Sequence, residues 1–138
     1  MTRMRHPSTD LPDALVLFAH GARDARWSQT LSQLADAIRA LAAAEAPGRE
    51  LHVSTAFLEF QPPTLQDALD QAMRDGARRI DILPVFWASG GHVANDVPPL
   101  LAAFRASHPA LQLRMLPVLS ELPGMLDFIA AGALRGGR

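Results

Sequence analysis

The chain of 138 residues contains no cysteine, and all thirteen of its basic residues are arginines, so it has no lysine either. Without cysteine the protein has no disulfide, no iron–sulfur cluster, no thiolate zinc site and no cysteine nucleophile. Without lysine, a P-loop lysine, a Schiff-base lysine and a lysine general base are also excluded. Any metal that this chain handles must therefore be held by nitrogen and oxygen ligands.

A basic block and a long apolar run are missing as well. The net charge is −1, with 49% apolar and 20% charged residues, which is the composition of a globular domain with a hydrophobic core. We expect no nucleic-acid partner and no membrane association. The apolar stretch 14–19 is too short for the core of a signal peptide, so the predicted location is the cytoplasm.

Four short apolar runs predict four β-strands, at residues 14–19, 51–57, 79–86 and 111–119. Each run is followed by a stretch with helical periodicity. This alternation predicts an α/β fold with a four-stranded parallel sheet and helices on both faces. We expect one domain at residues 14–134, a flexible N-terminal tail at residues 1–13 and a frayed C-terminus at residues 135–138.

Local signals also predict where the helices begin. Asp24 is the predicted N-cap of the first helix, and Thr64 with Asp67 resembles a capping box at the second. The pair Asn95–Asp96 is interpreted as the cap of the third helix, with Pro98 early in that helix. The last helix is predicted at residues 122–134.

The residues that follow the strands indicate a site, because ligands of open α/β sheets bind beyond the carboxyl ends of the strands. His20 follows the first strand, Glu59 follows the second, and His92 lies in a glycine-bearing loop after the third. If the first three strands lie in the order 2-1-3, these side chains come from neighbouring positions on one edge. Two imidazoles and a carboxylate suit a divalent first-row metal, and they also accept protons near neutral pH. A single histidine at a strand end is more often structural, but three such residues favour a functional site.

Other residues near the same edge have both functional and structural interpretations. Arg23 lies in the loop after the first strand, where a guanidinium could clamp a carboxylate or a phosphate. Trp87 could pack a flat ligand or form the rim of the core, and Gly90-Gly91 is a weak signal alone. Asp24 and Asp96 are better explained as helix caps than as ligands.

Three segments together resemble a known family. They are Val16-Leu-Phe-Ala-His-Gly-Ala-Arg23, then Thr55-Ala-Phe-Leu-Glu59 followed by Pro62-Pro63, then Leu83-Pro-Val-Phe-Trp-Ala-Ser-Gly-Gly-His-Val-Ala-Asn-Asp-Val-Pro98. In this order they resemble the short form of the CbiX-type sirohydrochlorin chelatases, within the class II tetrapyrrole chelatases. The similarity runs from about residue 14 to residue 119. One departure is Ala22, where the family commonly has serine.

The resemblance implies a flavodoxin-like half-chelatase that inserts a divalent metal into sirohydrochlorin, on the way to cobalamin or sirohaem. The metal would be Co²⁺, with Fe²⁺ and Ni²⁺ as the other candidates, and no organic cofactor is implied. A second copy would complete a homodimer, because one sheet offers only one wall to a macrocycle. The implied catalytic and metal-handling residues are His20, Glu59 and His92. The implied substrate contacts are Arg23, Trp87, Gly90, Gly91 and Asp96.

Two alternatives stay open at this point. A non-catalytic metal or tetrapyrrole carrier could share the fold and the same residues. An unrelated metal-dependent hydrolase would use the same donor set, but it usually needs further Asp or His ligands, and only Asp24 and Asp96 are available. The sequence also leaves open which metal is physiological and which of the three site residues is the base.

Overall fold

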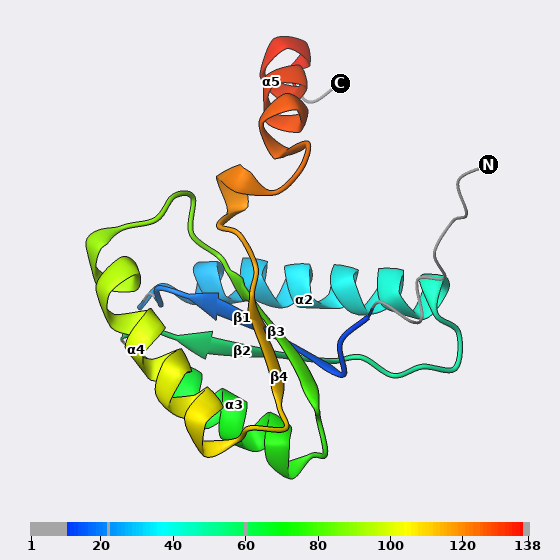
Figure 1. Cartoon of the computed structure of the whole chain (residues 1–138). Helices are drawn as coiled ribbons and strands as arrows, with labels where there is room; N and C mark the ends of the chain where they lie inside the picture. Colours follow the sequence, from blue (N-terminus) through cyan, green and yellow to red (C-terminus); the bar gives the residue numbers. More distant parts are fainter. Residues whose placement is uncertain (1–10, 22, 60, 137–138) are drawn as a thin grey trace, which may run out of the picture.

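The structure is a computed structural model that describes residues 11–21, 23–59 and 61–136. It contains one four-stranded parallel sheet in the order β2-β1-β3-β4 (Figure 1). The strands are β1 (Ala14–Ala19), β2 (His52–Phe57), β3 (Arg79–Pro84) and β4 (Gln112–Met115). The predicted α/β fold and the 2-1-3 order of the first three strands are confirmed.

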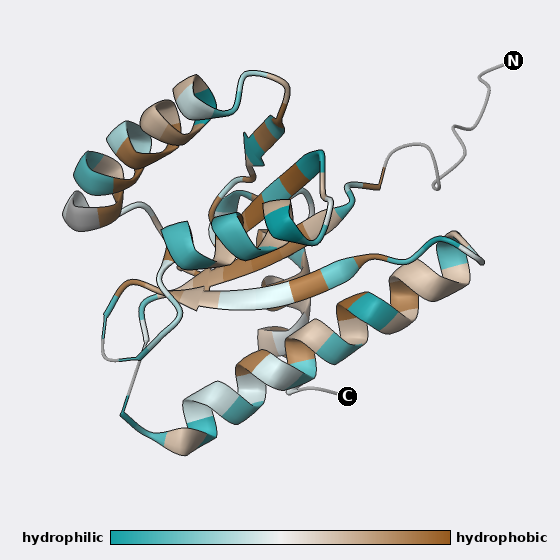
Figure 2. Cartoon of the chain, turned by 90° about the horizontal axis from the view of Figure 1, so that it is seen from below, coloured by the Kyte–Doolittle hydropathy of each residue, from teal (hydrophilic) through white to brown (hydrophobic). Residues whose placement is uncertain are grey.

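Helices cover both faces of this sheet. α2 (Ala25–Glu45) packs on one face, and α3 (Leu65–Arg74) and α4 (Gly91–Ser107) pack on the other (Figure 1). β1 is buried along its whole length, with Val16 and Phe18 facing α3 and α4, and Leu15 and Leu17 facing α2. The continuous apolar run of β1 follows from burial on both faces. Figure 2 shows the same pattern as brown, hydrophobic segments along the strands and teal positions on the helices.

Two of the predicted helix starts are confirmed in atomic detail. The Asp24 carboxylate caps α2 by accepting a hydrogen bond from the main-chain nitrogen of Arg26 at 2.9 Å. Thr64 and Asp67 form the predicted capping box at the start of α3. Both caps satisfy main-chain donors that the first turn of a helix leaves without a partner.

The predicted start of the third helix is wrong. α4 has Gly90 as its N-cap and begins at Gly91, so Asn95–Asp96 lies inside the helix and Pro98 lies in its middle. A proline there removes a main-chain hydrogen bond and usually disrupts a helix. Burial explains why the helix continues: Val97, Leu101 and Phe104 are each at most 5% exposed against the sheet, whereas Pro98 faces solvent.

The chain end also differs from the prediction in its boundaries. After β4 comes a single 3₁₀ turn, η1 (Leu119–Glu121), and then α5 (Met125–Arg135). α5 begins three residues later than predicted, because Pro123 disfavours helical geometry at Leu122, which is extended. Gly124 then caps α5 in a left-handed conformation with φ of 82°.

Parts of the predicted domain division lie outside the described residues. Residues 1–10 of the predicted tail and residues 137–138 of the predicted frayed end belong to those parts. The division itself stays a prediction. Among the described residues, none of the helices combines the length and apolar character that crossing a membrane requires.

Candidate functional site

The carboxyl ends of β1 and β2 bring His20 and Glu59 together. The pairing of the two strands continues past their ends, where the main-chain nitrogen of Glu59 donates to the carbonyl of His20 at 3.0 Å. The side chains follow the backbone, with 3.3 Å between His20 Nε2 and Glu59 Oε2. Each side chain is 52% exposed, so the pair is accessible to a ligand from solvent.

Gly21 makes this close approach possible. It is buried in the turn after β1 and has a φ of 97°, a conformation that favours glycine. A Cβ atom at this position would overlap the main-chain carbonyl oxygen of Glu59. The sequence shows Gly21 beside His20, but it gives no sign of the contact with Glu59.

The third predicted site residue, His92, lies in the first turn of α4 rather than in a loop. Its side chain lies outside the described residues. β3 is the neighbour of β1, and α4 follows β3, so the backbone of His92 belongs to the carboxyl side of the same sheet. Among the described side chains there is no group of three or more metal donors.

The predicted substrate contacts also lie on loops and turns that follow β1 and β3. Arg23 is exposed between β1 and α2, and Trp87 is 54% exposed just after β3. Asp96 is exposed within α4, one turn beyond His92. A Cβ atom at Gly90 or Gly91 would meet nothing within 4 Å, so packing within this chain does not require glycine at either position.

The carboxylate of Asp24 is hydrogen-bonded to Arg26, two residues further along the chain. Its carboxylate accepts from the Arg26 guanidinium at 2.7 Å as well as from the Arg26 main chain. These side-chain and main-chain hydrogen bonds lower the pKa of Asp24 below its ordinary value. The structural interpretation of Asp24 as a cap is therefore confirmed, whereas Asp96 is not a cap.

A contact that the sequence analysis missed holds the segment after Glu59. The side-chain amide of Gln61 donates to the hydroxyl of Ser28 at 3.4 Å, which joins the β2–α3 connection to the first turns of α2. Gln61 and Ser28 are 33 residues apart, and nothing in their local sequence marks them as partners.

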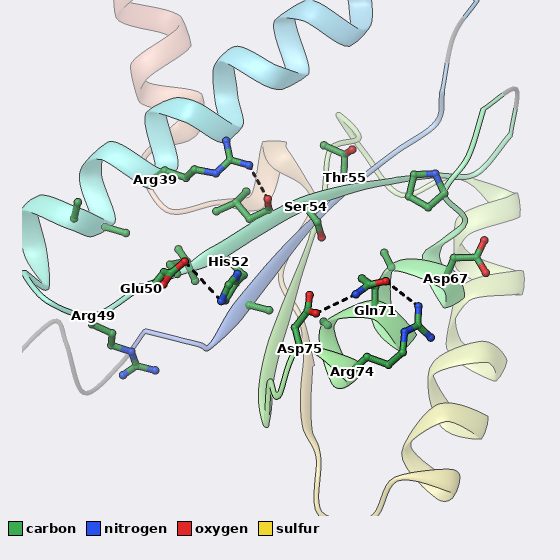
Figure 3. A pocket seen from close by; sticks show the side chains of 18 of the residues that line it. Arg39, Arg49, Glu50, His52, Ser54, Thr55, Asp67, Gln71, Arg74 and Asp75 are labelled. Carbon is green, nitrogen blue, oxygen red and sulfur yellow. Dashed lines mark hydrogen bonds and ion pairs between the residues drawn. The ribbon is translucent and has the colours of Figure 1, made fainter.

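A groove of about 950 Å³ lies elsewhere, along the free side of β2 between α2 and α3 (Figure 3). Arg39 crosses part of it and donates to the main-chain carbonyl of Val53 at 2.7 Å. Several other polar side chains of the groove bind one another, as Gln71 does with Asp75 at 3.0 Å. None of the predicted site residues lines this groove, so it is separate from the His20–Glu59 pair.

The chain is similar to known proteins in both sequence and structure. A family model described as CbiX matches residues 14–134. The chain is 35% identical over 98 residues to a protein from Methanocaldococcus jannaschii named sirohydrochlorin cobaltochelatase, which covers 70% of this chain and 63% of the relative. A protein of the same name from Methanococcus aeolicus is 30% identical over 91 residues, covering 64% of this chain and 58% of the relative. The matched part of the chain thus spans about three fifths of the length of these curated relatives.

Solved structures with similar folds include one of nearly equal length. A putative cobalamin biosynthesis CbiX protein from Marinobacter aquaeolei has a TM-score of 0.67 and 26% identity, covering 91% of this chain and 96% of that one. SirB from Bacillus subtilis, solved with Fe³⁺, has a TM-score of 0.69 at 17% identity. The alignment with SirB covers 93% of this chain but 48% of the SirB chain, and at this identity it shows the fold alone. The family match extends over nearly the whole chain, from β1 to the last full turn of α5, and it shows that the protein belongs to the CbiX family.

Proposed function

We propose that this chain is a sirohydrochlorin chelatase, which inserts a divalent metal ion into the tetrapyrrole in the pathway to cobalamin or sirohaem. The observation that carries the proposal is the 3.3 Å approach of His20 and Glu59 at the carboxyl ends of adjacent strands, in a chain of the CbiX family. The names of the relatives from M. jannaschii and M. aeolicus support the same activity.

In the proposed reaction the metal ion is a substrate. His20 and Glu59 would supply one nitrogen and one oxygen donor, a set that accepts first-row divalent ions. His92 would add a second nitrogen from the first turn of α4. Few protein ligands leave coordination positions open, and the ion needs those positions to pass to the four nitrogens of the macrocycle.

Insertion also releases protons. Two pyrrole N–H groups each lose a proton, while the metal dication takes their place, so the charge of the macrocycle centre is balanced. Imidazoles and carboxylates are the groups that most often act as general bases, so His20 and Glu59 are the candidates for accepting these protons. Both side chains of the His20–Glu59 pair are half exposed, which allows protons to leave to solvent.

The substrate would lie against the loops after β1 and β3. Trp87 offers an exposed ring to the flat macrocycle, and the open space at Gly90 and Gly91 lets it approach the α4 backbone. Arg23 is a candidate for pairing with the peripheral carboxylates, since a lysine-free chain binds carboxylates through arginine. Asp96 is placed one turn from His92 and would contact the same ligand.

Several further assignments belong to this proposal. We propose the cytoplasm as the compartment. We propose Co²⁺ as the first metal to test, followed by Fe²⁺ and Ni²⁺, with no organic cofactor. We also propose a homodimer, because a single four-stranded sheet forms one wall and a macrocycle needs two.

The test is cobalt insertion into sirohydrochlorin, followed by absorbance, with Fe²⁺ and Ni²⁺ run in parallel. His20→Ala and His92→Ala are each expected to lower the rate by roughly 100-fold, as for loss of an acid–base group. His52→Ala is the matched control, because His52 also faces a glutamate, Glu50 at 3.9 Å, but at the opposite end of β2. Normal activity in both site variants would refute the assignment.

Tetrapyrrole binding and a hydrolysis assay, measured beside metal insertion, separate the alternatives. A carrier would bind sirohydrochlorin tightly without raising the rate above that of the free metal and tetrapyrrole. A hydrolase would turn over a panel of esters and phosphoesters in a metal-dependent manner. Hydrolase activity would need ligands other than Asp24, whose carboxylate is engaged by Arg26.

A further inference from the structure

α5 is an apolar helix that the rest of the described chain does not cover. Only Asp127 and Arg135 carry charge among its eleven residues, and none of those residues is buried. Within the described part of the chain six large apolar side chains are exposed, and four of them belong to α5. Figure 1 shows α5 standing away from the sheet beyond η1. A helix of this composition is normally covered on at least one side.

Beside the partly buried Val85 and Leu116, the α2 side of the sheet carries an ion pair. On the α2 side of β3 and β4, where a further helix could pack, Asp81 and Arg114 lie side by side. Arg114 Nη2 is 2.7 Å from Asp81 Oδ2, and Arg114 Nε is 3.2 Å from Asp81 Oδ1. Covering this ion pair with leucine and phenylalanine would remove the guanidinium, 65% exposed, from water without new partners.

One face of α5 is suited to pairing with a copy of itself. Residues at i, i+1, i+4, i+7 and i+8 lie on one side of a helix. In α5 these positions hold Asp127, Phe128, Ala131, Leu134 and Arg135. Phe128 and Leu134 are 76% and 86% exposed, the highest values among the large apolar side chains of the described residues.

This face is symmetric about Ala131. Reading outward from the alanine in either direction gives a large apolar residue and then a charge. The charge is negative toward the N-terminus and positive toward the C-terminus. Two copies placed antiparallel about Ala131 therefore match Phe128 with Leu134 and Asp127 with Arg135 at both ends.

We propose that α5 is the contact between two copies of this chain, packed antiparallel with Ala131 at the crossing point. A small residue at the crossing allows the short interaxial distance of about 8 Å at the lower end of helix packing. The two apolar pairs supply the association energy, and the charges at the rim select the antiparallel direction. The inference rests on the homodimer proposed above and names its contact. A monomeric native chain would count against both, whereas a dimer that survives substitution of this α5 face would count against the contact alone.

The first test is the mass of the full chain in solution, by light scattering and by sedimentation over a range of concentrations. The native chain should be a dimer, and Phe128→Glu and Leu134→Glu should each weaken the dimer by about 100-fold, as expected for a central apolar contact. Leu41→Glu is the control, because Leu41 is an apolar residue of α2 that is 61% exposed and should leave the dimer intact. Circular dichroism confirms that each variant is folded.

Native protein that is monomeric at tens of micromolar would overturn the proposal. So would a dimer that survives Phe128→Glu and Leu134→Glu together, or one that is lost in Leu41→Glu. None of these positions belongs to the sheet or its two cores, so loss of the fold is not expected to obscure the result.

The second test determines whether the two helices are parallel or antiparallel. Because the native chain has no cysteine, every disulfide must involve an introduced cysteine. Ala131→Cys alone should form a disulfide-linked dimer under mild oxidation, because position 131 meets its own copy. Asp127→Cys alone should stay unlinked, whereas a mixture of Asp127→Cys and Arg135→Cys chains should link. Efficient linking of Asp127→Cys to itself would show a parallel pair and overturn the antiparallel arrangement.

Discussion

Gly21 and Glu59 touch through their backbones, and only the absence of a side chain at Gly21 allows it. Glu59 is in turn hydrogen-bonded to His20 through its main-chain nitrogen. The turn after β1 and the end of β2 therefore form one unit, which holds the imidazole and the carboxylate 3.3 Å apart. Gly21 is a positioning residue for this pair.

Replacing Gly21 with alanine should disturb both stability and the site. The positive φ costs about 1–2 kcal/mol for a residue with a Cβ, and the overlap with Glu59 adds about 1–3 kcal/mol of overpacking. Urea unfolding measures the total. The rate of cobalt insertion should fall at least tenfold under conditions where the variant is folded, because the Glu59 carboxylate is displaced.

Gly48→Ala is the matched control for that variant. Gly48 has a φ of 85°, but a Cβ there would meet nothing within 4 Å. It should show the cost of the positive φ alone, about 1–2 kcal/mol, with unchanged insertion. Equal effects of the two substitutions on insertion would show that the contact with Glu59 does not position the pair.

A second prediction concerns the ion pair between Asp81 and Arg114. Asp81 is 8% exposed, and its hydrogen bonds raise the pKa of Arg114. Arg114→Ala should cost about 2 kcal/mol, because it leaves a carboxylate in a buried position without its main partner.

The double variant Asp81→Leu with Arg114→Leu should recover most of that loss, since no buried charge then remains. Thermal or urea unfolding of the two variants gives the comparison. A double variant that is less stable than Arg114→Ala would mean that the ion pair is a net source of stability.

The third prediction is that the free energy of unfolding depends on pH through Asp13. The carboxylate of Asp13 accepts main-chain hydrogen bonds from Arg78 at 2.9 Å and Arg79 at 3.0 Å, and a side-chain bond from Arg49 at 3.1 Å. The Arg78 bond is the largest cause of a lowered pKa, which partial burial opposes. A lowered pKa stabilises the fold above the ordinary value of 3.8, and this stabilisation disappears as the pH falls through the folded value.

Asp13→Asn should therefore be less stable than the native chain by about 1–2 kcal/mol at pH 7. The difference should shrink as the pH falls below the ordinary value of 3.8 and through the lowered pKa of Asp13, because the native carboxyl is then protonated too. Urea midpoints at several pH values provide the measurement. Asp36→Asn, at an exposed pair with Arg39, should change little at any pH, and a constant Asp13→Asn difference down to pH 2 would contradict the prediction.

The fourth prediction tests the capping box of α3. Thr64→Ala removes the acceptor for the main-chain nitrogen of Asp67, which lies 3.1 Å away, and should cost about 1 kcal/mol. Thr64→Ser keeps the hydroxyl and should retain most of the stability. The pair is compared by urea unfolding, and equal losses for alanine and serine would exclude the hydrogen bond as the cause.

Features set by local sequence were predictable. The buried strand β1, the cap Asp24 and the capping box of Thr64 each depend on residues within one turn or one strand. The approach of His20 and Glu59 was predictable for a related reason, because parallel strands deliver their carboxyl ends to one edge. The place of the His92 side chain stays a prediction.

Features set by contacts distant in sequence were not predictable. The start of α4 was misplaced because Val97, Leu101 and Phe104 bury their side chains strongly enough to carry the helix past Pro98. The Gln61–Ser28 contact has no local signal. The periodicity at residues 122–134 predicts a helix, but it gives no sign that four large apolar side chains of α5 are exposed.

The hydrogen bond from Arg39 to Val53 has a consequence for how molecules of this protein meet. β2 is the outermost strand on its side of the sheet, and Val53 directs its carbonyl away from β1, toward the open groove. A foreign strand that added itself to this edge would have to displace a guanidinium and leave that charge without its acceptor. Arg39 therefore disfavours the addition of a strand from another molecule at the edge of β2. Two copies would then associate through α5, as proposed above, and not through this edge of the sheet.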